Sequence, residues 1–142
     1  MAEKTRNGGE WTEARHRSFV TSALRQGSQR WPVKHKALKR AWVSRGVYKC
    51  ECCGVEGPKT LPPLEGQKRR RNNATVDHIK PIVDPAVGFT TWDSFIEGLY
   101  CELDNLQVLC YSSNSPKCEE EKQIAKERRA NEKLNAKSTN TK

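Results

Sequence analysis

The spacing of apolar residues predicts two amphipathic helices in the first third of the chain. Thr12 can cap the first helix, which is expected to run to about Gln26, because Gly27 suits the position just past a helix end. The second is expected to begin at Pro32, a residue suited to a first helical position, and to run to Arg45. The apolar stripes are Phe19, Val20, Ala23 and Leu24 in the first helix and Ala37, Leu38, Ala41 and Trp42 in the second.

The second half of the chain combines short apolar runs with one short helical pattern. Residues 74–79 and 106–109 are apolar runs of strand length. Between them, Thr90 or Thr91 can cap a helix over about 92–99. Helices and strands that follow one another in this way predict a small α+β fold.

The remaining segments are expected to be irregular, apart from one charged helix. Glycine and proline recur through residues 54–73, which predicts a loop. A charged helix is expected from residue 119 to about 134. Residues 1–10 and 136–142 are polar and are expected to be disordered.

Composition and charge narrow the class of protein. The chain has 142 residues, of which 35% are apolar, so one modest core is expected. Residues 1–49 hold 12 Lys or Arg and 3 Asp or Glu, whereas residues 50–142 hold 14 of each, so the N-terminal third carries the whole net charge of +9. A basic helical segment at 11–46 indicates a polyanion partner, with nucleic acid as the first hypothesis. A solvated basic surface that aids solubility is the alternative.

The chain is not expected to cross or to anchor in a membrane. It has no apolar run of membrane-spanning length, and its first residues lack the apolar stretch of a secretion signal. We therefore expect a protein of the reducing cytoplasm. In that compartment clustered cysteines bind metal more often than they form disulfides.

An acid and a histidine stand together in the first predicted strand. His78 can serve as a general base, because imidazole titrates near neutral pH. Asp77 and the amide oxygen of Asn114 are hard ligands that suit a divalent ion such as Mg²⁺ or Mn²⁺. Neighbouring residues of a strand point to opposite faces, so Asp77 and His78 need a local twist or bulge to serve one phosphate. Asn105 can hydrogen-bond backbone groups and hold the loop that follows the histidine.

The cysteines have the spacing of a zinc knuckle. Cys50 and Cys53 are the expected pair, and Cys110 is expected to add a third thiolate. The nearest downstream thiol, Cys118, is the expected fourth ligand of a structural Zn²⁺. The alternative is that all six cysteines carry no metal.

Two groups of basic residues are expected to contact phosphates. One lies just before the strand with the histidine, and the other lies on the second helix. They are Lys68, Arg69, Arg70 and Arg71 in the first group and Lys36, Lys39 and Arg40 in the second.

Taken together, these residues resemble the HNH endonucleases, and within them the small phage-encoded type. The resemblance implies a ββα-metal domain, here residues 47–118, built around a structural zinc, with a charged helix and tail at 119–142. It also implies that His78 is the general base, that Asn105 is structural, and that Asp77 and Asn114 bind the catalytic ion. The segments that carry the resemblance are 22–25, 30–32, 48–50, 76–79, 88–93 and 104–110.

The resemblance has one notable variation and one departure. The last motif position is Asn114, as in the HNN variant, which the Holliday-junction-resolving phage endonucleases resemble. Where the family has a fourth cysteine this chain has Ser113, and Cys118 stands where the family usually has none. Either Cys118 compensates, or the site has three thiolates and a weak fourth ligand, or Ser113 is an engineered change. The expected function is a metal-dependent DNA endonuclease of a phage-infected bacterial cell, with phage packaging or replication proteins as further partners. The alternative is a zinc-stabilised DNA-binding module that has lost catalysis.

Overall fold

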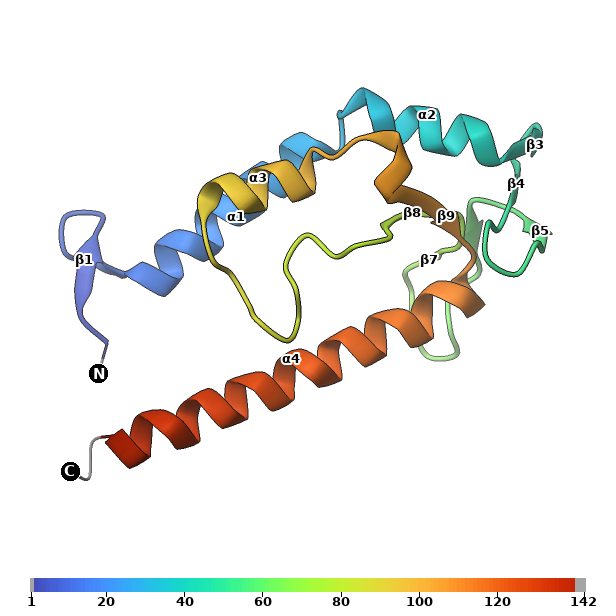
Figure 1. The fold of residues 1–142 in the computed structure, drawn as a ribbon. Helices are drawn as coiled ribbons and strands as arrows, with labels where there is room; N and C mark the ends of the chain where they lie inside the picture. The colour runs from blue at the N-terminus through green and yellow to red at the C-terminus, as the bar shows by residue number, and fades with distance from the viewer. Residues whose placement is uncertain (1, 140–142) are drawn as a thin grey trace. The chain divides into compact units, whose positions relative to one another are not determined.

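A computed structural model of the chain describes residues 2–139 as a small α+β protein with short antiparallel strands (Figure 1). The contacts divide the chain into two compact units, Met1–Trp31 and Pro32–Lys142. The division falls between the two helices that were expected to form one basic segment at 11–46. The second helix therefore belongs to the same unit as the cysteines and the histidine.

The N-terminal unit is a small hairpin followed by helix α1, Glu13–Ser28. Strand β1, Lys4–Arg6, pairs with β2, Trp11–Thr12, so the prediction that residues 1–10 are disordered is wrong for the described part. Asn7, Gly8 and Gly9 have positive φ angles, which lets the chain reverse between the two strands. As predicted, Thr12 caps α1, and its Oγ1 accepts a hydrogen bond from the Arg15 amide at 3.2 Å.

Helix α2 is shorter than predicted. It covers Pro32–Ala41, after which β3, Trp42–Ser44, turns back into β4, Val47–Lys49. Gly46, with φ of 74°, lies in the turn, and Trp42 pairs with Tyr48 across the strands. The helical spacing of the apolar residues was misleading here, because Trp42 and Val43 pair well in strands and Gly46 allows a tight turn.

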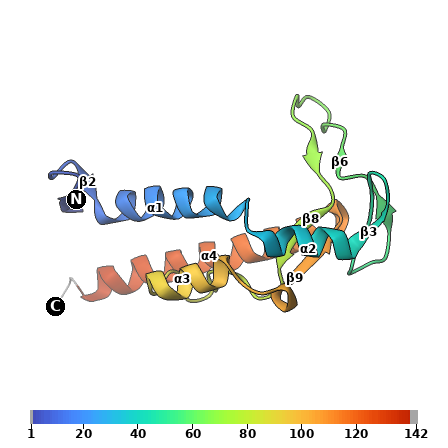
Figure 2. The same cartoon turned by 90° about the horizontal axis from the view of Figure 1, so that it is seen from above.

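The segment 54–73 contains strands that the glycine and proline pattern did not predict. Strand β5, Glu56–Gly57, pairs with β4, and β6, Thr60–Leu61, pairs with β7, Arg71–Asn72. Figure 2 shows the β6–β7 hairpin extending away from β8 and α2 as an arm.

The centre of the second unit is the antiparallel hairpin of β8, Thr75–His78, and β9, Leu106–Leu109. Between them lie α3, Trp92–Leu99, with the predicted bounds, and a single turn of 3₁₀-helix at Leu103–Asn105. Leu106 and Val108 are each 1% exposed and lie on one face of β9. The buried side chains of α2 and α3 complete this core; they are Val33, Ala37, Ala41, Phe95 and Leu99.

Helix α4, Tyr111–Thr139, begins directly after Cys110 rather than at residue 119 as predicted. The Asn114 amide donates to the Cys110 carbonyl oxygen at 2.9 Å, in the first turn of this helix, and Tyr111 follows the last residue of the 3₁₀ turn, Asn105, by six positions. The helix continues to Thr139, so residues 136–139 are helical rather than disordered, and residues 140–142 lie outside the described part. In Figure 1, α2 and α4 lie on opposite sides of the β8–β9 hairpin.

The loop 79–91 runs from β8 down to α4 and returns to α3 (Figure 1). Gly88, with φ of 87°, touches α4 so closely that a Cβ there would lie 1.5 Å from Arg128 Nη1. The Arg128 side chain could move to make room for a Cβ, so it is the left-handed backbone conformation that favours glycine at this position.

Candidate metal centre and acid–histidine site

Three thiols meet where β4 and β9 end. The Sγ atoms of Cys50, Cys53 and Cys110 all lie within 4.8 Å of one another, and those of Cys53 and Cys110 are 3.6 Å apart. The Glu51 amide donates to the Val108 carbonyl oxygen at 2.8 Å, which brings the knuckle beside β9. Three soft thiolates at this spacing fit a zinc-class ion. The sequence correctly placed these three residues together.

The turn that carries the first two cysteines favours the thiolate of Cys50. Burial of Cys50 raises its thiol pKa, but hydrogen bonds from Ser113 Oγ and from the backbone amides of Cys53, Cys110 and Cys52 act in the opposite direction. Together they lower the pKa of Cys50 to about 6. Because the thiolate is the form that binds metal, the fold prepares this ligand before any ion arrives.

The predicted fourth ligand, Cys118, does not join this cluster in the described residues. Its thiol is 3.7 Å from Asn114 Oδ1, further along α4. The side chain that α4 brings to the cluster is Ser113, whose Oγ lies 3.5 Å from the Sγ atoms of both Cys50 and Cys110. The prediction that Cys118 replaces the missing cysteine failed because α4 begins eight residues earlier than expected and turns Cys118 away.

Asp77 and His78 are neighbours in β8, but their side chains meet different elements. The β8–β9 register is regular, with Asp77 opposite Gln107 and His78 opposite Leu106, so the expected bulge is not present in this strand. Asp77 is directed towards α4, and Gln107 Nε2 donates to its Oδ2 at 3.2 Å. His78 Nε2 lies 3.4 Å from the carbonyl oxygen of Leu99, at the end of α3.

Asn105 makes the backbone contacts that were predicted for it. Its Oδ1 accepts from the Lys80 amide at 2.9 Å, and its Nδ2 donates to the Lys80 carbonyl oxygen at 3.2 Å. The Ile79 amide also donates to the Asn105 carbonyl oxygen at 2.9 Å. These bonds fix the chain directly after His78.

A residue that sequence reasoning missed, Lys117, joins α4 to the acid. Its Nζ forms an ion pair with Asp77 Oδ2 and donates to the His78 carbonyl oxygen at 2.7 Å. Glu121 lies one turn further, with Oε1 3.7 Å from the same Nζ. Asn114 lies one turn before Lys117 on this helix. Lys117 follows Asn114 by three residues, so the two share one face of a helix. A helix predicted to start at residue 111 would therefore have indicated Lys117 as a neighbour of the site.

The seven predicted phosphate contacts fall into two classes. Lys36, Lys39, Lys68 and Arg69 are exposed, as phosphate contacts must be. Arg40 instead forms a two-pronged ion pair with Glu51, at 3.0 and 2.8 Å, and donates to the Leu106 carbonyl oxygen at 2.7 Å. Its guanidinium therefore joins α2, the knuckle and β9, while its side chain stays 40% exposed, and its phosphate contact stays a prediction.

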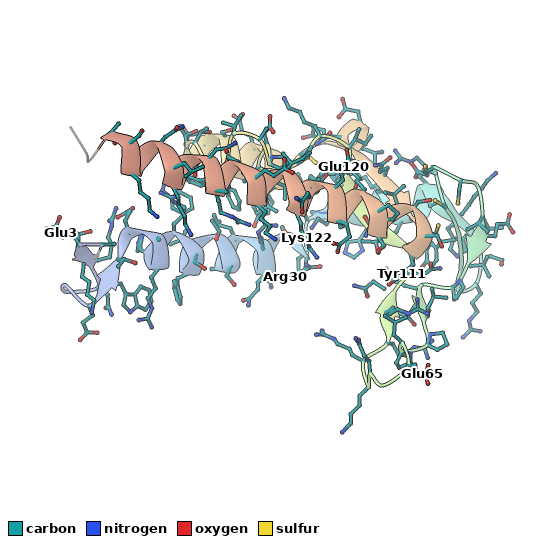
Figure 3. All side chains as sticks on the ribbon, turned by 90° about the horizontal axis from the view of Figure 1, so that it is seen from below. Glu3, Arg30, Glu65, Tyr111, Glu120 and Lys122 are labelled. Atoms are coloured by element: carbon teal, nitrogen blue, oxygen red, sulfur yellow. The ribbon has the colours of Figure 1, made fainter. Side chains whose placement is uncertain are left out.

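Two arginines of the arm are also held by the fold. Arg70 donates to Thr60 Oγ1 at 3.1 Å, and Arg71 donates to the Pro62 carbonyl oxygen at 2.9 Å. The Arg71 guanidinium lies 4.6 Å from the ring centre of Tyr111. Figure 3 shows Tyr111 at the start of α4, beside the arm that carries Glu65. These bonds join both arginines to the arm, but Arg70 is exposed like Lys68 and Arg69, and the phosphate contacts of Arg70 and Arg71 stay predictions.

Comparison with known proteins finds no matching family model, no matching curated protein and no matching solved structure. Within residues 2–139, the helices are all too short or too polar to cross a membrane.

Proposed function

We propose that the chain is a metal-dependent DNA endonuclease of the HNH type. The observation that carries the proposal is the contact of Lys117 on α4 with the Asp77 carboxylate and the His78 carbonyl oxygen on β8. It makes β8, β9 and α4 one ββα unit, with the acid at its centre. The three-cysteine cluster closes the end of this unit where β9 passes into α4.

His78 has the hydrogen bond that a general base needs. A histidine whose Nε2–H donates to a carbonyl, as His78 can to Leu99, carries its basic lone pair on Nδ1. The Asn105 bonds to the Lys80 backbone hold the chain two residues after His78, which supports the position of that histidine in the strand. In the proposed reaction, His78 removes the proton from the water that attacks the phosphorus.

Asp77, with Asn114 on the facing helix, would hold the divalent ion. Mg²⁺ or Mn²⁺ in that position would neutralise charge on the scissile phosphate and on the leaving oxygen. The Asp77 carboxylate already has a cation beside it, and that cation is Lys117. The Lys117 ammonium must therefore leave Asp77 when the ion binds, and a nearby phosphate is a suitable new partner for it.

DNA is proposed to lie along the exposed cations of α2 and the arm. Lys36 and Lys39 lie on α2, and Lys68 and Arg69 lie near the end of the arm. Lysine contacts to phosphate give affinity with little sequence preference. The basic N-terminal unit adds further positive charge to the same chain.

One specific observation favours the second candidate, a zinc-stabilised DNA-binding module without catalysis. Asp77 and His78 meet different elements, and Asp77 is already neutralised by Lys117. Cleavage of supercoiled plasmid with Mg²⁺ or Mn²⁺ separates the two functions. The endonuclease predicts nicked or linear products that disappear in His78→Ala, typically a loss of about 10²- to 10⁴-fold.

The matched control is His35→Ala, which removes an exposed histidine of α2. It should cut like the unmodified chain. Equal cutting by His78→Ala would exclude the proposed base. DNA binding without any cutting, under either metal, would establish the binding module instead.

A further inference from the structure

The cysteine cluster has three thiols and a hydroxyl where a structural zinc site has four strong ligands. Ser113, in the first turn of α4, lies 3.5 Å from the sulfurs of both Cys50 and Cys110. Structural zinc sites use thiolate, imidazole or carboxylate donors in a closed tetrahedron. A neutral serine hydroxyl is a weak metal donor, but it is a good hydrogen-bond donor to a thiolate.

No other thiol of the described chain completes the tetrahedron. Cys118 follows Ser113 by five residues, which places it about 7.5 Å further along the helix and about 140° around its axis. Its thiol meets Asn114 Oδ1 instead. Cys52 and Cys101 also fall outside the cluster. The fourth position of an ion bound here is therefore not supplied by cysteine.

The cluster borders a hollow that is open to solvent. This hollow has a volume of about 520 Å³, and its lining includes Lys49, Cys50, Cys52 and Cys53. Cys50 is 4% exposed, whereas Cys53 is an exposed residue at the rim. A small molecule can therefore approach the thiols from this side; the charged residues of the lining are Lys49 and the paired Arg40 and Glu51.

We propose that Cys50, Cys53 and Cys110 form an open metal centre for a zinc-class ion, whose fourth position takes water or a small thiolate from solution. Ser113 hydrogen-bonds to the Cys50 and Cys110 thiolates and is not itself a ligand. Such a centre exchanges its outer ligand and releases its metal more readily than a four-cysteine site does. The inference does not depend on whether the chain cuts DNA.

Cobalt absorption tests the number of sulfur ligands directly. The full chain, kept reduced with a phosphine and freed of metal, is titrated with Co²⁺ and compared with Ser113→Cys, Ser113→Ala and Cys118→Ser. The sulfur-to-cobalt band of the unmodified chain should have about three quarters of the intensity of the Ser113→Cys band, because three of four tetrahedral positions are thiolate. Ser113→Ala and Cys118→Ser should keep the intensity of the unmodified chain.

Added 2-mercaptoethanol gives the second measurement. It should raise the sulfur-to-cobalt band of the unmodified chain towards that of Ser113→Cys and leave Ser113→Cys unchanged. In competition with a chelator, Ser113→Cys should hold the metal at least about tenfold more tightly, since loss of even an outer partner of a ligand costs that much. If Ser113→Cys does not fold, the response of the unmodified chain to 2-mercaptoethanol and the Cys118→Ser spectrum decide the question.

Three results would overturn the open centre. A reduced band in Cys118→Ser would show that Cys118 is the fourth ligand. A changed band in Ser113→Ala would show that Ser113 binds the ion. A folded, reduced chain that takes up neither Co²⁺ nor Zn²⁺ would show that the cluster is not a metal centre.

Discussion

The Lys117 ammonium forms an ion pair with the Asp77 carboxylate, so the acid of the candidate site is balanced by a cation from the facing helix. The two side chains are 26% and 19% exposed, which makes this pair partly buried. A residue that was absent from the sequence-based site thus supplies the positive charge beside the Asp77 carboxylate.

Removing Lys117 should have opposite effects on stability and on ion binding. In Lys117→Met, the Asp77 carboxylate loses its partner, which should lower the free energy of unfolding by about 1–3 kcal/mol. A divalent ion no longer competes with the ammonium, so Mn²⁺ should bind more tightly. Urea unfolding without added Mn²⁺ and Mn²⁺ titration by electron paramagnetic resonance measure the two effects.

Lys122→Met is the matched control for Lys117→Met. Lys122 lies on the same helix, and its side chain is 74% exposed beside Glu119. The change should alter stability by less than about 0.5 kcal/mol and leave Mn²⁺ affinity unchanged. Unchanged Mn²⁺ affinity in Lys117→Met would show that Asp77 is not an ion ligand.

Asn105→Ala should loosen the chain after His78. The substitution removes both side-chain bonds to Lys80 and should cost about 1–3 kcal/mol of stability. Amide hydrogen exchange at Lys80 should accelerate, because that N–H loses its acceptor. Asn105→Asp keeps the acceptor oxygen and should retain most of the protection; if both variants exchange alike, the loop is held by other contacts.

Arg40 and Lys39 are adjacent on α2 but should behave differently. Arg40→Ala breaks the bonds to Glu51 and to the Leu106 carbonyl oxygen, so it should cost about 1–3 kcal/mol of stability. Lys39→Ala should leave stability unchanged and weaken DNA binding, with a smaller dependence of affinity on salt. Thermal unfolding and DNA titrations at several salt concentrations separate the two; a stable Arg40→Ala protein with weak DNA binding would reverse their roles.

The lowered pKa of Cys50 makes the metal-free protein sensitive to pH. In the folded chain Cys50 is a thiolate above about pH 6. In the unfolded chain the same thiol, with an ordinary pKa of 9.0, keeps its proton up to about pH 9. Because the unfolded chain binds more protons between these values, stability should rise from pH 6 to pH 9. Below pH 6 this contribution is lost. Urea unfolding across this range should show a smaller slope for Cys50→Ser, and equal slopes would contradict the lowered pKa.

The parts of the fold that were predictable depend on local sequence. The bounds of β9 and α3 and the cap at Thr12 follow from periodicity and capping, which act over a few residues. The cysteine cluster followed from spacing and the chemistry of thiolates.

What was missed depends on pairs that are distant in the sequence. The ion pair of Asp77 with Lys117 and that of Arg40 with Glu51 cannot be read from spacing, because any cation of suitable length could have been the partner. The end of α2 was also missed, since pairing of Trp42 with Tyr48 outweighs the helical preference of the segment. The early start of α4 then decided the places of Ser113, Lys117 and Cys118.

The Arg40 bonds to Glu51 and to the Leu106 carbonyl oxygen join the helix that carries Lys36 and Lys39 to the turn that carries the cysteines. Without metal, the turn that carries the cysteines would be less rigid. Because Arg40 joins that turn to α2, the positions of Lys36 and Lys39 on α2 would be less well fixed. DNA and metal would then favour the same state of the chain, and thermodynamic reciprocity requires that each tightens the other by an equal factor. Under the proposed DNA binding, a chain without metal should therefore bind DNA more weakly.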